Sequence, residues 1–171
     1  MAARIELSVT EWVVLALLAE GPTHGFAISK ELRPDADLGR VLTVHRPVVY
    51  RALDRLAAAG LVEVGRPEPG AGPNRTVHRT TRRGRSAVAR WLDRPVDHVR
   101  DLRIEFLVKL RLNQRRGRDL VDVVEAQRAT LAGTFERLAD GSDDDVVERW
   151  RRHNARAAAA FLDGLAEAAN E

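Results

Sequence analysis

Hydrophobic and polar residues recur with a helical period over most of the chain. The first helical segment follows Ser8-Val9-Thr10-Glu11, which has the spacing of a capping box with Ser8 as the N-cap. Apolar residues from Trp12 to Leu18 lie nearly all round the expected helix, so we expect it to be buried. Gly21-Pro22 ends this helix. Thr23 is a suitable N-cap for a second, shorter helix over residues 25–32.

A third helix is predicted within the segment VHRPVVYRALDRLAAAG, residues 44–60. Pro47 suits the first turn and Gly60 is the expected C-terminal stop. The apolar stripe expected to face inward consists of Val49, Leu53, Leu56 and Ala57. The period then changes to two, so Val62 and Val64 are predicted to anchor a strand to the core. RPEPGAGPN is expected to turn the chain rather than continue the strand, and RTVHRTT forms the returning strand.

Beyond the hairpin, Thr81 is a suitable cap for a fourth helix whose Val88, Trp91 and Leu92 face inward. The Asp93-Arg94-Pro95 interruption predicts a domain boundary, which gives domains of residues 1–94 and 95–171. In the second domain, apolar residues recur at spacings of three and four over 99–113, 120–138 and 147–168. Such spacing is typical of helices that pack along their length. The predicted fold is therefore mostly α, with a β-hairpin in the first domain and a coiled-coil-like three-helix second domain.

Charge is distributed unevenly along the chain. The formal net charge is +3, yet residues 40–90 hold 11 arginines and 3 acids, a local net charge of +8. Residues 95–171 hold 13 Lys or Arg and 15 acids, a net charge of −2. An ordinary solvated surface is enough to explain the net charge of the whole chain. A basic segment of this kind, however, is typical of proteins that bind a polyanion.

Three helices followed by a two-stranded hairpin is the order of a winged helix-turn-helix, whose third helix enters the DNA major groove. Arg51 and Arg55 lie one turn apart on the third helix, and His45 and Arg46 stand at its N-terminus, where backbone N–H groups attract phosphate. Tyr50 can donate its hydroxyl to a phosphate. The hairpin residues expected to contact the DNA backbone are Arg66, Asn74, Arg75 and Arg79. Each alone is more commonly a solvated or half-buried side chain, but together they indicate DNA binding.

Four segments of the chain carry motifs of a known kind, residues 17–32, 48–63, 80–88 and 105–112. Together they resemble segments of the PadR family of transcriptional regulators. LLAEGPTHGFAISKEL (residues 17–32) is similar to an N-terminal motif of the family, with Phe26 at a usual tyrosine position, and VVYRALDRLAAAGLVE (48–63) is similar to its recognition helix. TTRRGRSAV (80–88) and EFLVKLRL (105–112) resemble the segment after the wing and the start of a longer C-terminal helical domain. The chain departs from the family pattern at HRP (45–47) and at HRTT (78–81). The resemblance implies a dimeric regulator, usually a repressor, that a small and often aromatic molecule releases from DNA.

The C-terminal heptad-like segments also predict dimerisation, because they present more apolar surface than one chain can bury. The residues expected at the dimer contact are Phe106, Leu110, Val147, Trp150, Asn154, Phe161 and Leu165. Asn154 suits a register-setting polar residue or, equally, a hydrogen-bonded core asparagine. The family resemblance implies an effector pocket, for which the aromatic candidates are Trp12, Trp91, Phe106 and Trp150. Each of these also suits plain core or a dimer contact.

Other classes of function have little support in the sequence. The chain has no cysteine, and its five histidines lack metal-ligand spacing, so we expect neither an enzyme nor a metal or cofactor. The uncharged run over residues 12–19 is too short to span a bilayer, and nothing resembles a signal peptide, which favours a cytoplasmic protein without a membrane partner. We therefore expect a homodimeric repressor on a palindromic operator in double-stranded DNA. The alternative is a winged-helix interaction module whose arginines bind an acidic protein partner.

Overall fold

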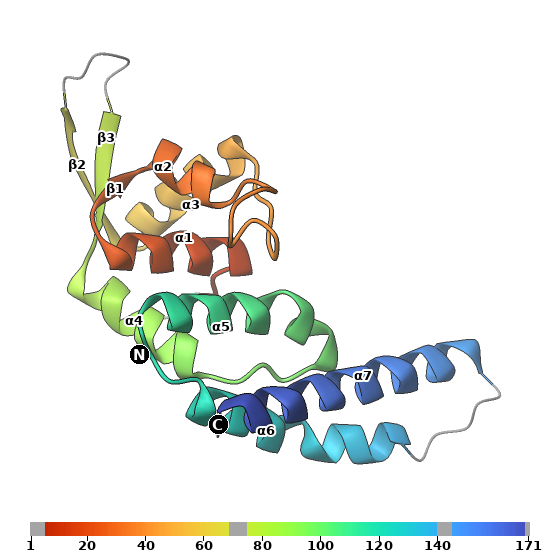
Figure 1. The fold of residues 1–171 in the computed structure, drawn as a ribbon. Coiled ribbons are helices and arrows are strands. Elements are labelled where there is room, and N and C mark those ends of the chain that lie inside the picture. Colours follow the sequence, from red (N-terminus) through yellow and green to blue (C-terminus); the bar gives the residue numbers. More distant parts are fainter. Residues whose placement is uncertain (1–5, 69–74, 140–144, 170–171) are drawn as a thin grey trace. The chain divides into compact units, whose positions relative to one another are not determined.

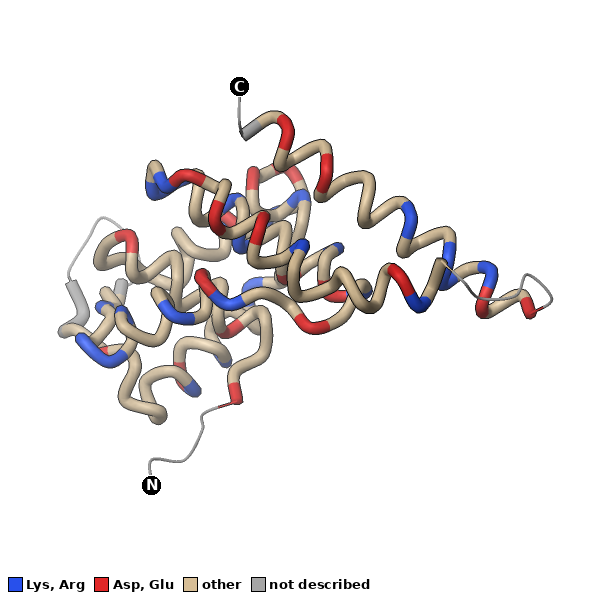
Figure 2. The backbone as a smooth tube through the Cα atoms, turned by 90° about the horizontal axis from the view of Figure 1, so that it is seen from below, with Lys and Arg blue, Asp and Glu red and all other residues tan. Residues whose placement is uncertain are grey.

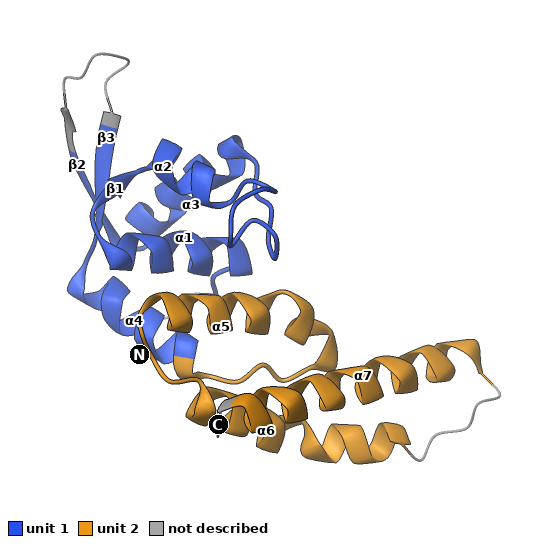
Figure 3. Ribbon diagram, viewed as in Figure 1, with its two compact units in different colours: residues 1–92 blue, residues 93–171 orange. Residues whose placement is uncertain are grey.

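The structure is a computed structural model that describes residues 6–68, 75–139 and 145–169. The chain forms two compact units, residues 1–92 (unit 1) and residues 93–171 (unit 2), coloured separately in Figure 3. The described residues are mostly helical, with one small antiparallel sheet in unit 1. This architecture confirms the predicted fold class.

Unit 1 holds four helices and three short strands (Figure 1). The helices are α1 (Val9–Glu20), α2 (Gly25–Glu31), α3 (Arg46–Ala58) and α4 (Arg82–Asp93). The strands β1 (Thr23–His24), β2 (Val62–Glu68) and β3 (Arg75–Thr80) pair antiparallel in the order β1-β3-β2. The β2–β3 hairpin projects from the helices and is the wing of the winged helix-turn-helix (Figure 1).

Three local signals in the sequence act as predicted. The Glu11 N–H donates to Ser8 Oγ and the Ser8 N–H donates to Glu11 Oε2, at 3.3 and 2.7 Å, which completes the capping box of α1. The Gly84 N–H donates to Thr81 Oγ1 at 3.0 Å, so Thr81 caps α4. Gly60 follows α3 with a φ of +68°, a left-handed conformation that favours glycine.

The start of α2 differs from the prediction, because His24 caps this helix instead of Thr23. His24 Nδ1 accepts the N–H of Ala27 at 3.0 Å. Thr23 lies in β1 opposite His78 of β3, in a two-residue strand that the sequence pattern did not reveal. A histidine N-cap is less common than Ser, Thr, Asp or Asn, which is why the pattern favoured its neighbour.

Two expectations for the hairpin are wrong. Val62 is buried, but Val64 is 58% exposed and does not anchor β2 to the core. The strand also continues through Pro67 to Glu68, although the prolines and glycines predicted a turn from residue 66. β2 is an edge strand whose register shifts between Val64 and Pro67, and an edge strand with a bulge tolerates proline.

One face of α3 packs into the core of unit 1. Val49, Leu53 and Leu56 are fully buried, as the apolar stripe predicted. Helix α3 packs against α1 and α2, and the Thr80 hydroxyl donates to the carbonyl of Leu18 at 3.2 Å, which ties β3 to α1. The opposite face of α3 is therefore turned to solvent on a well-supported helix.

Unit 2 consists of a 3₁₀ turn, η1 (Val99–Arg103), followed by α5 (Glu105–Arg115), α6 (Val121–Ala139) and α7 (Val146–Ala169). The predicted single helix over 99–113 is thus two elements, η1 and α5, which meet at Ile104. Helices α6 and α7 lie side by side (Figure 1). The core of the unit includes Leu102, Phe106, Leu110, Val124, Leu131, Leu162 and Ala166. Among the described helices, none combines the length and apolarity that crossing a bilayer requires.

Candidate nucleic-acid interface

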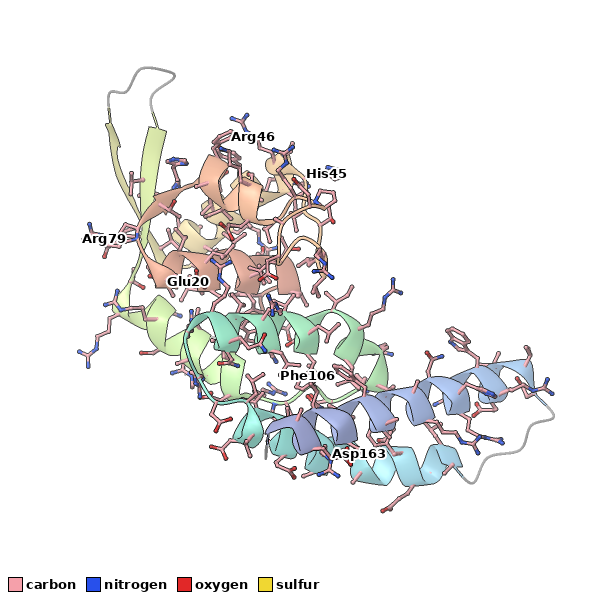
Figure 4. The ribbon with its side chains drawn as sticks, in the orientation of Figure 1. Glu20, His45, Arg46, Arg79, Phe106 and Asp163 are labelled. Atoms are coloured by element: carbon pink, nitrogen blue, oxygen red, sulfur yellow. The ribbon has the colours of Figure 1, made fainter. Side chains whose placement is uncertain are left out.

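The solvent-facing side of α3 carries the charged residues that the sequence singled out. Arg46, Tyr50, Arg51 and Arg55 are all exposed, and Asp54 is the acid among them. Figure 4 shows His45 and Arg46 at the start of α3 with their side chains directed outward. Figure 2 marks the charged positions along the backbone, and the basic excess of residues 40–90 lies entirely in unit 1.

His45 occupies the N-cap of α3 but makes no side-chain capping hydrogen bond. Its exposed imidazole is therefore not used to begin the helix. Pro47 lies in the first turn, where a missing N–H costs nothing. Residues 45–47, where the chain departs from the family pattern, therefore still begin α3. They place the side chains of His45 and Arg46 at its N-terminus.

Arg51 and Arg55 are one turn apart but differ in their surroundings. Arg55 Nη1 donates to Glu11 Oε1 at 2.8 Å, so this arginine joins α3 to α1. Within the described residues, Arg51 forms no ion pair and no side-chain hydrogen bond. Of the two, Arg51 is the one whose guanidinium is available for a new anionic partner.

The hairpin contributes one described arginine side chain, Arg79, which lies exposed on β3 and points away from the unit (Figure 4). It pairs in register with Glu63 of β2. Arg66 and Arg75 belong to β2 and β3, but their side chains lie outside the described part of the structure, as does the whole of Asn74.

His78 sits next to Arg79 but faces the other way and is buried. Burial lowers the pKa of His78 below its ordinary value of 6.5, and this effect outweighs a hydrogen bond with the Thr76 backbone and the charge of Asp54, which both raise it. Its Nδ1 has no hydrogen-bond partner in the described structure. His78 therefore packs beneath the wing and is not part of its exposed basic face.

Three residues of this face were not singled out from the sequence: His24, Phe26 and Lys30. The Phe26 ring of α2 has Lys30 Nζ 5.0 Å and Arg46 Cζ 5.5 Å from its centroid. The His24 and Phe26 ring centroids are 6.4 Å apart. The segment HGF at residues 24–26 carries a family resemblance, and nothing local to it indicates that α3 brings a cation to the phenyl ring.

The residues predicted for dimerisation separate into two groups. Phe106 and Leu110 are buried in the core of unit 2, and Leu165 is half-buried. Val147, Trp150, Asn154 and Phe161 are exposed and share one side of α7, and we call these four residues the α7 stripe. Trp150 is the most exposed of its aromatic members, at 69%. The Asn154 side-chain amide donates to the Trp150 carbonyl at 2.9 Å, so it is bonded to its own helix and is not a core residue.

The aromatic residues considered for an effector lie in different places. In unit 1, Trp12 and Trp91 stack with ring centroids 5.4 Å apart. In unit 2, Phe106 is part of the core, whereas Trp150 lines an open cavity of about 880 Å³. The cavity has apolar walls from Leu102, Leu107 and Phe161, and Arg103 and Arg137 stand among its lining residues.

Comparison with known proteins connects this interface to a family. Residues 14–90 match the model of the transcriptional regulator PadR-like family, a match that spans nearly all of unit 1. PadR of Bacillus subtilis in complex with operator DNA is 18% identical, over 98% of this chain and 97% of that chain, with a TM-score of 0.51, and shares the fold. No curated protein matches the sequence.

Two further solved structures are similar at lower TM-scores. Bacillus subtilis PadR in complex with p-coumaric acid is 17% identical over 96% of this chain and 100% of that chain, with a TM-score of 0.45. A transcriptional regulator from Clostridium thermocellum is 26% identical over 47% of this chain and 74% of that chain, with a TM-score of 0.39.

Proposed function

We propose, from the premise that the chain belongs to the PadR-like family of transcriptional regulators, that it is a dimeric repressor which binds a palindromic DNA operator. The observation that carries this proposal is the exposed face of α3, where Arg46, Tyr50 and Arg51 are available on a helix whose other face is fixed in the core. An α-helix of this kind fits the major groove of B-DNA, which is about 12 Å wide.

The two kinds of contact that such a helix makes can be divided among these residues. Arg51 lies one turn inside α3, where a guanidinium can reach a guanine edge or a phosphate. Arg46 stands at the helix start, a position suited to the sugar-phosphate backbone, and the Tyr50 hydroxyl one turn further on can donate to a phosphate. Arg79 is placed on the wing, where it would contact backbone beside the groove. Arg66, Asn74 and Arg75 remain proposed wing contacts on sequence grounds.

Dimerisation would use the α7 stripe. Its exposed Val147, Trp150 and Phe161 form an apolar side of a long helix, and the rest of α7 packs against its own unit through Leu162 and Ala166. A two-fold axis at this surface would present two copies of α3 to DNA, and half-sites would then lie about 34–36 Å apart, one helical turn. This arrangement requires a palindromic or near-palindromic operator.

A small aromatic effector that relieves repression is the remaining part of the proposal. The cavity of unit 2 supports it, because Leu102 and Leu107 offer apolar walls and Arg103 and Arg137 offer positive charge for an anionic group. Trp150 and Phe161 also line the cavity, so in the proposed dimer they would be shared between the effector site and the subunit contact. Thermal melting of the protein with a panel of small aromatic acids tests this part. A raised Tm together with weaker operator binding is the expected result, and a ligand that raises the Tm without weakening operator binding would contradict relief of repression.

The experiment that tests the main proposal is recovery and sequencing of genomic DNA fragments retained by the purified protein. We expect enrichment of a few fragments that share an inverted repeat. Fragments without a common sequence would contradict a specific regulator, and would favour the alternative in which the arginines bind an acidic protein.

A further inference from the structure

The phenyl ring of Phe26 holds two cations from two different helices. Lys30 Nζ lies 5.0 Å from the ring centroid and comes from the next turn of α2. Arg46 Cζ lies 5.5 Å from the same centroid and comes from the first turn of α3. Both distances are within the range at which a ring quadrupole attracts a cation. Arg46 is also 5.5 Å from the centroid of Tyr50, so aromatic rings of both helices contact its guanidinium.

The rings that make these contacts are themselves fixed in place. Gly25 has no side chain, and a Cβ there would lie 3.0 Å from both Tyr50 Cζ and Leu53 Cδ1, so the absence of a Cβ lets the tyrosine ring pack against the start of α2. On the other side, His24 stacks beside Phe26 and caps α2 through Nδ1. Phe26 and Tyr50 remain 38% exposed, so the cluster is both anchored and accessible.

The two cations have no acidic partner among the described residues. This distinguishes them from Arg55, which pairs with Glu11 on the same unit. Both positive charges lie within 5.5 Å of one ring centroid, so an anion beside this ring would be attracted by both. A ring contact leaves the N–H groups of both side chains free to donate to that anion.

We propose that Lys30 and Arg46 together bind one DNA phosphate as a clamp. Phe26 is the positioning residue that keeps both side chains in place in the free protein. The inference rests on the proposed function, and it adds α2 to the elements that contact the DNA backbone. Holding both side chains over the ring reduces the conformational entropy that they lose on binding. Because the contact is to phosphate, the clamp contributes to affinity for any sequence and not to base preference.

The test is a mutant cycle measured by fluorescence anisotropy on a duplex of about 30 base pairs of arbitrary sequence, at low salt. The ring is removed in Phe26→Leu and kept in Phe26→Tyr, each in the wild-type background and with Lys30 and Arg46 both changed to alanine. In the wild-type background, we expect Phe26→Leu to weaken binding about three- to tenfold and Phe26→Tyr to stay within about twofold. In the double-alanine background, we expect Phe26→Leu to have no further effect.

Salt dependence provides the readout that a merely structural role would not change. Changing Lys30 and Arg46 together to alanine should reduce the slope of log affinity against log salt by about 0.9 per subunit, or about 1.8 per dimer, because both cations share one phosphate. Phe26→Leu retains both charges and the slope. An equal loss from Phe26→Leu in both backgrounds, or no loss in the wild-type background, would overturn the positioning role. An unchanged slope in the double-alanine variant would overturn the clamp, and so would losses of about 0.9 per subunit from each single substitution that add in the double, because these would indicate two separate phosphates.

Binding of the wild-type protein to the duplex separates the clamp from DNA binding itself. A wild-type protein that does not bind the duplex at low salt contradicts both, whereas normal wild-type binding without coupling in the cycle contradicts the clamp alone. Circular dichroism melts serve as the folding control, and Tm values close to wild type are expected because all three side chains are exposed.

Discussion

Arg55 Nη1 lies 2.8 Å from Glu11 Oε1, and this ion pair joins the exposed side of α3 to the first turn of α1. Glu11 is only 4% exposed, and its other carboxylate oxygen accepts the N–H of Ser8 at 2.7 Å. One carboxylate therefore completes the capping box of α1 and fixes a residue on the exposed side of α3. On sequence alone Arg55 is expected to contact DNA, and the pair gives it a structural partner as well.

Loss of this pair should destabilise unit 1. In Arg55→Ala the nearly buried Glu11 carboxylate loses its cation, and we expect the free energy of unfolding to fall by about 1–2 kcal/mol, less than for a fully buried pair because the Arg55 side chain is 67% exposed. Urea denaturation measures the change. Arg51→Ala is the matched control on the same helix, with an expected change within about 0.5 kcal/mol. Equal destabilisation by the two substitutions would contradict a structural role specific to Arg55.

DNA affinity should depend on Arg51, whose removal is not expected to change stability. Arg51 forms no ion pair in the described part of the structure, so Arg51→Ala should weaken DNA binding and reduce the salt slope by about 0.9 per subunit without loss of stability. The measurement is a binding titration at several salt concentrations, paired with the urea data above. Unchanged affinity and slope in Arg51→Ala would remove this residue from the proposed interface.

The α7 stripe should control the oligomeric state. Trp150→Glu places a charge at the centre of the exposed apolar side of α7, and we expect it to shift the protein from dimer to monomer in sedimentation equilibrium. Folding should be retained because the tryptophan is already exposed. Arg156→Ala, an exposed residue elsewhere on the same helix, is the control and should leave the dimer unchanged. A monomeric wild type, or a Trp150→Glu dimer of undiminished affinity, would contradict dimerisation through this surface.

Stability should depend on pH through His78. Because burial lowers its pKa in the folded protein below 6.5, the unfolded chain takes up this proton first as the pH falls. The free energy of unfolding should therefore decrease as the pH falls through about 6.5, and His78→Gln should remove part of that decrease. Urea denaturation at about pH 7.5 and about pH 5.5 measures it. The same decrease in wild type and variant would show that His78 is not its source.

Local patterns predicted the parts of the fold that depend on neighbours in sequence. Ser8 and Glu11 are three residues apart, as are Thr81 and Gly84, and both caps form as expected. Gly60 was recognisable because a left-handed residue after a helix favours glycine. The order of helices and strands followed from such signals together with the change in hydrophobic period.

Contacts between distant segments could not be predicted in the same way. Glu11 and Arg55 satisfy separate local patterns, and only the packing of α1 against α3 brings them together. The same holds for Arg46, whose position over Phe26 depends on the angle between α2 and α3. Val64 alternates correctly with Val62, but it lies where the hairpin has left the core, so periodicity alone misjudged its burial.

The most direct test of sequence-specific regulation compares binding to an operator recovered from genomic DNA with binding to a scrambled duplex of the same composition, across a salt series. We expect a preference for the operator of at least about a thousandfold at physiological salt, and a loss of about 10³–10⁵ in affinity between about 50 and about 200 mM salt. Equal affinity for the two duplexes at every salt concentration would contradict a sequence-specific regulator.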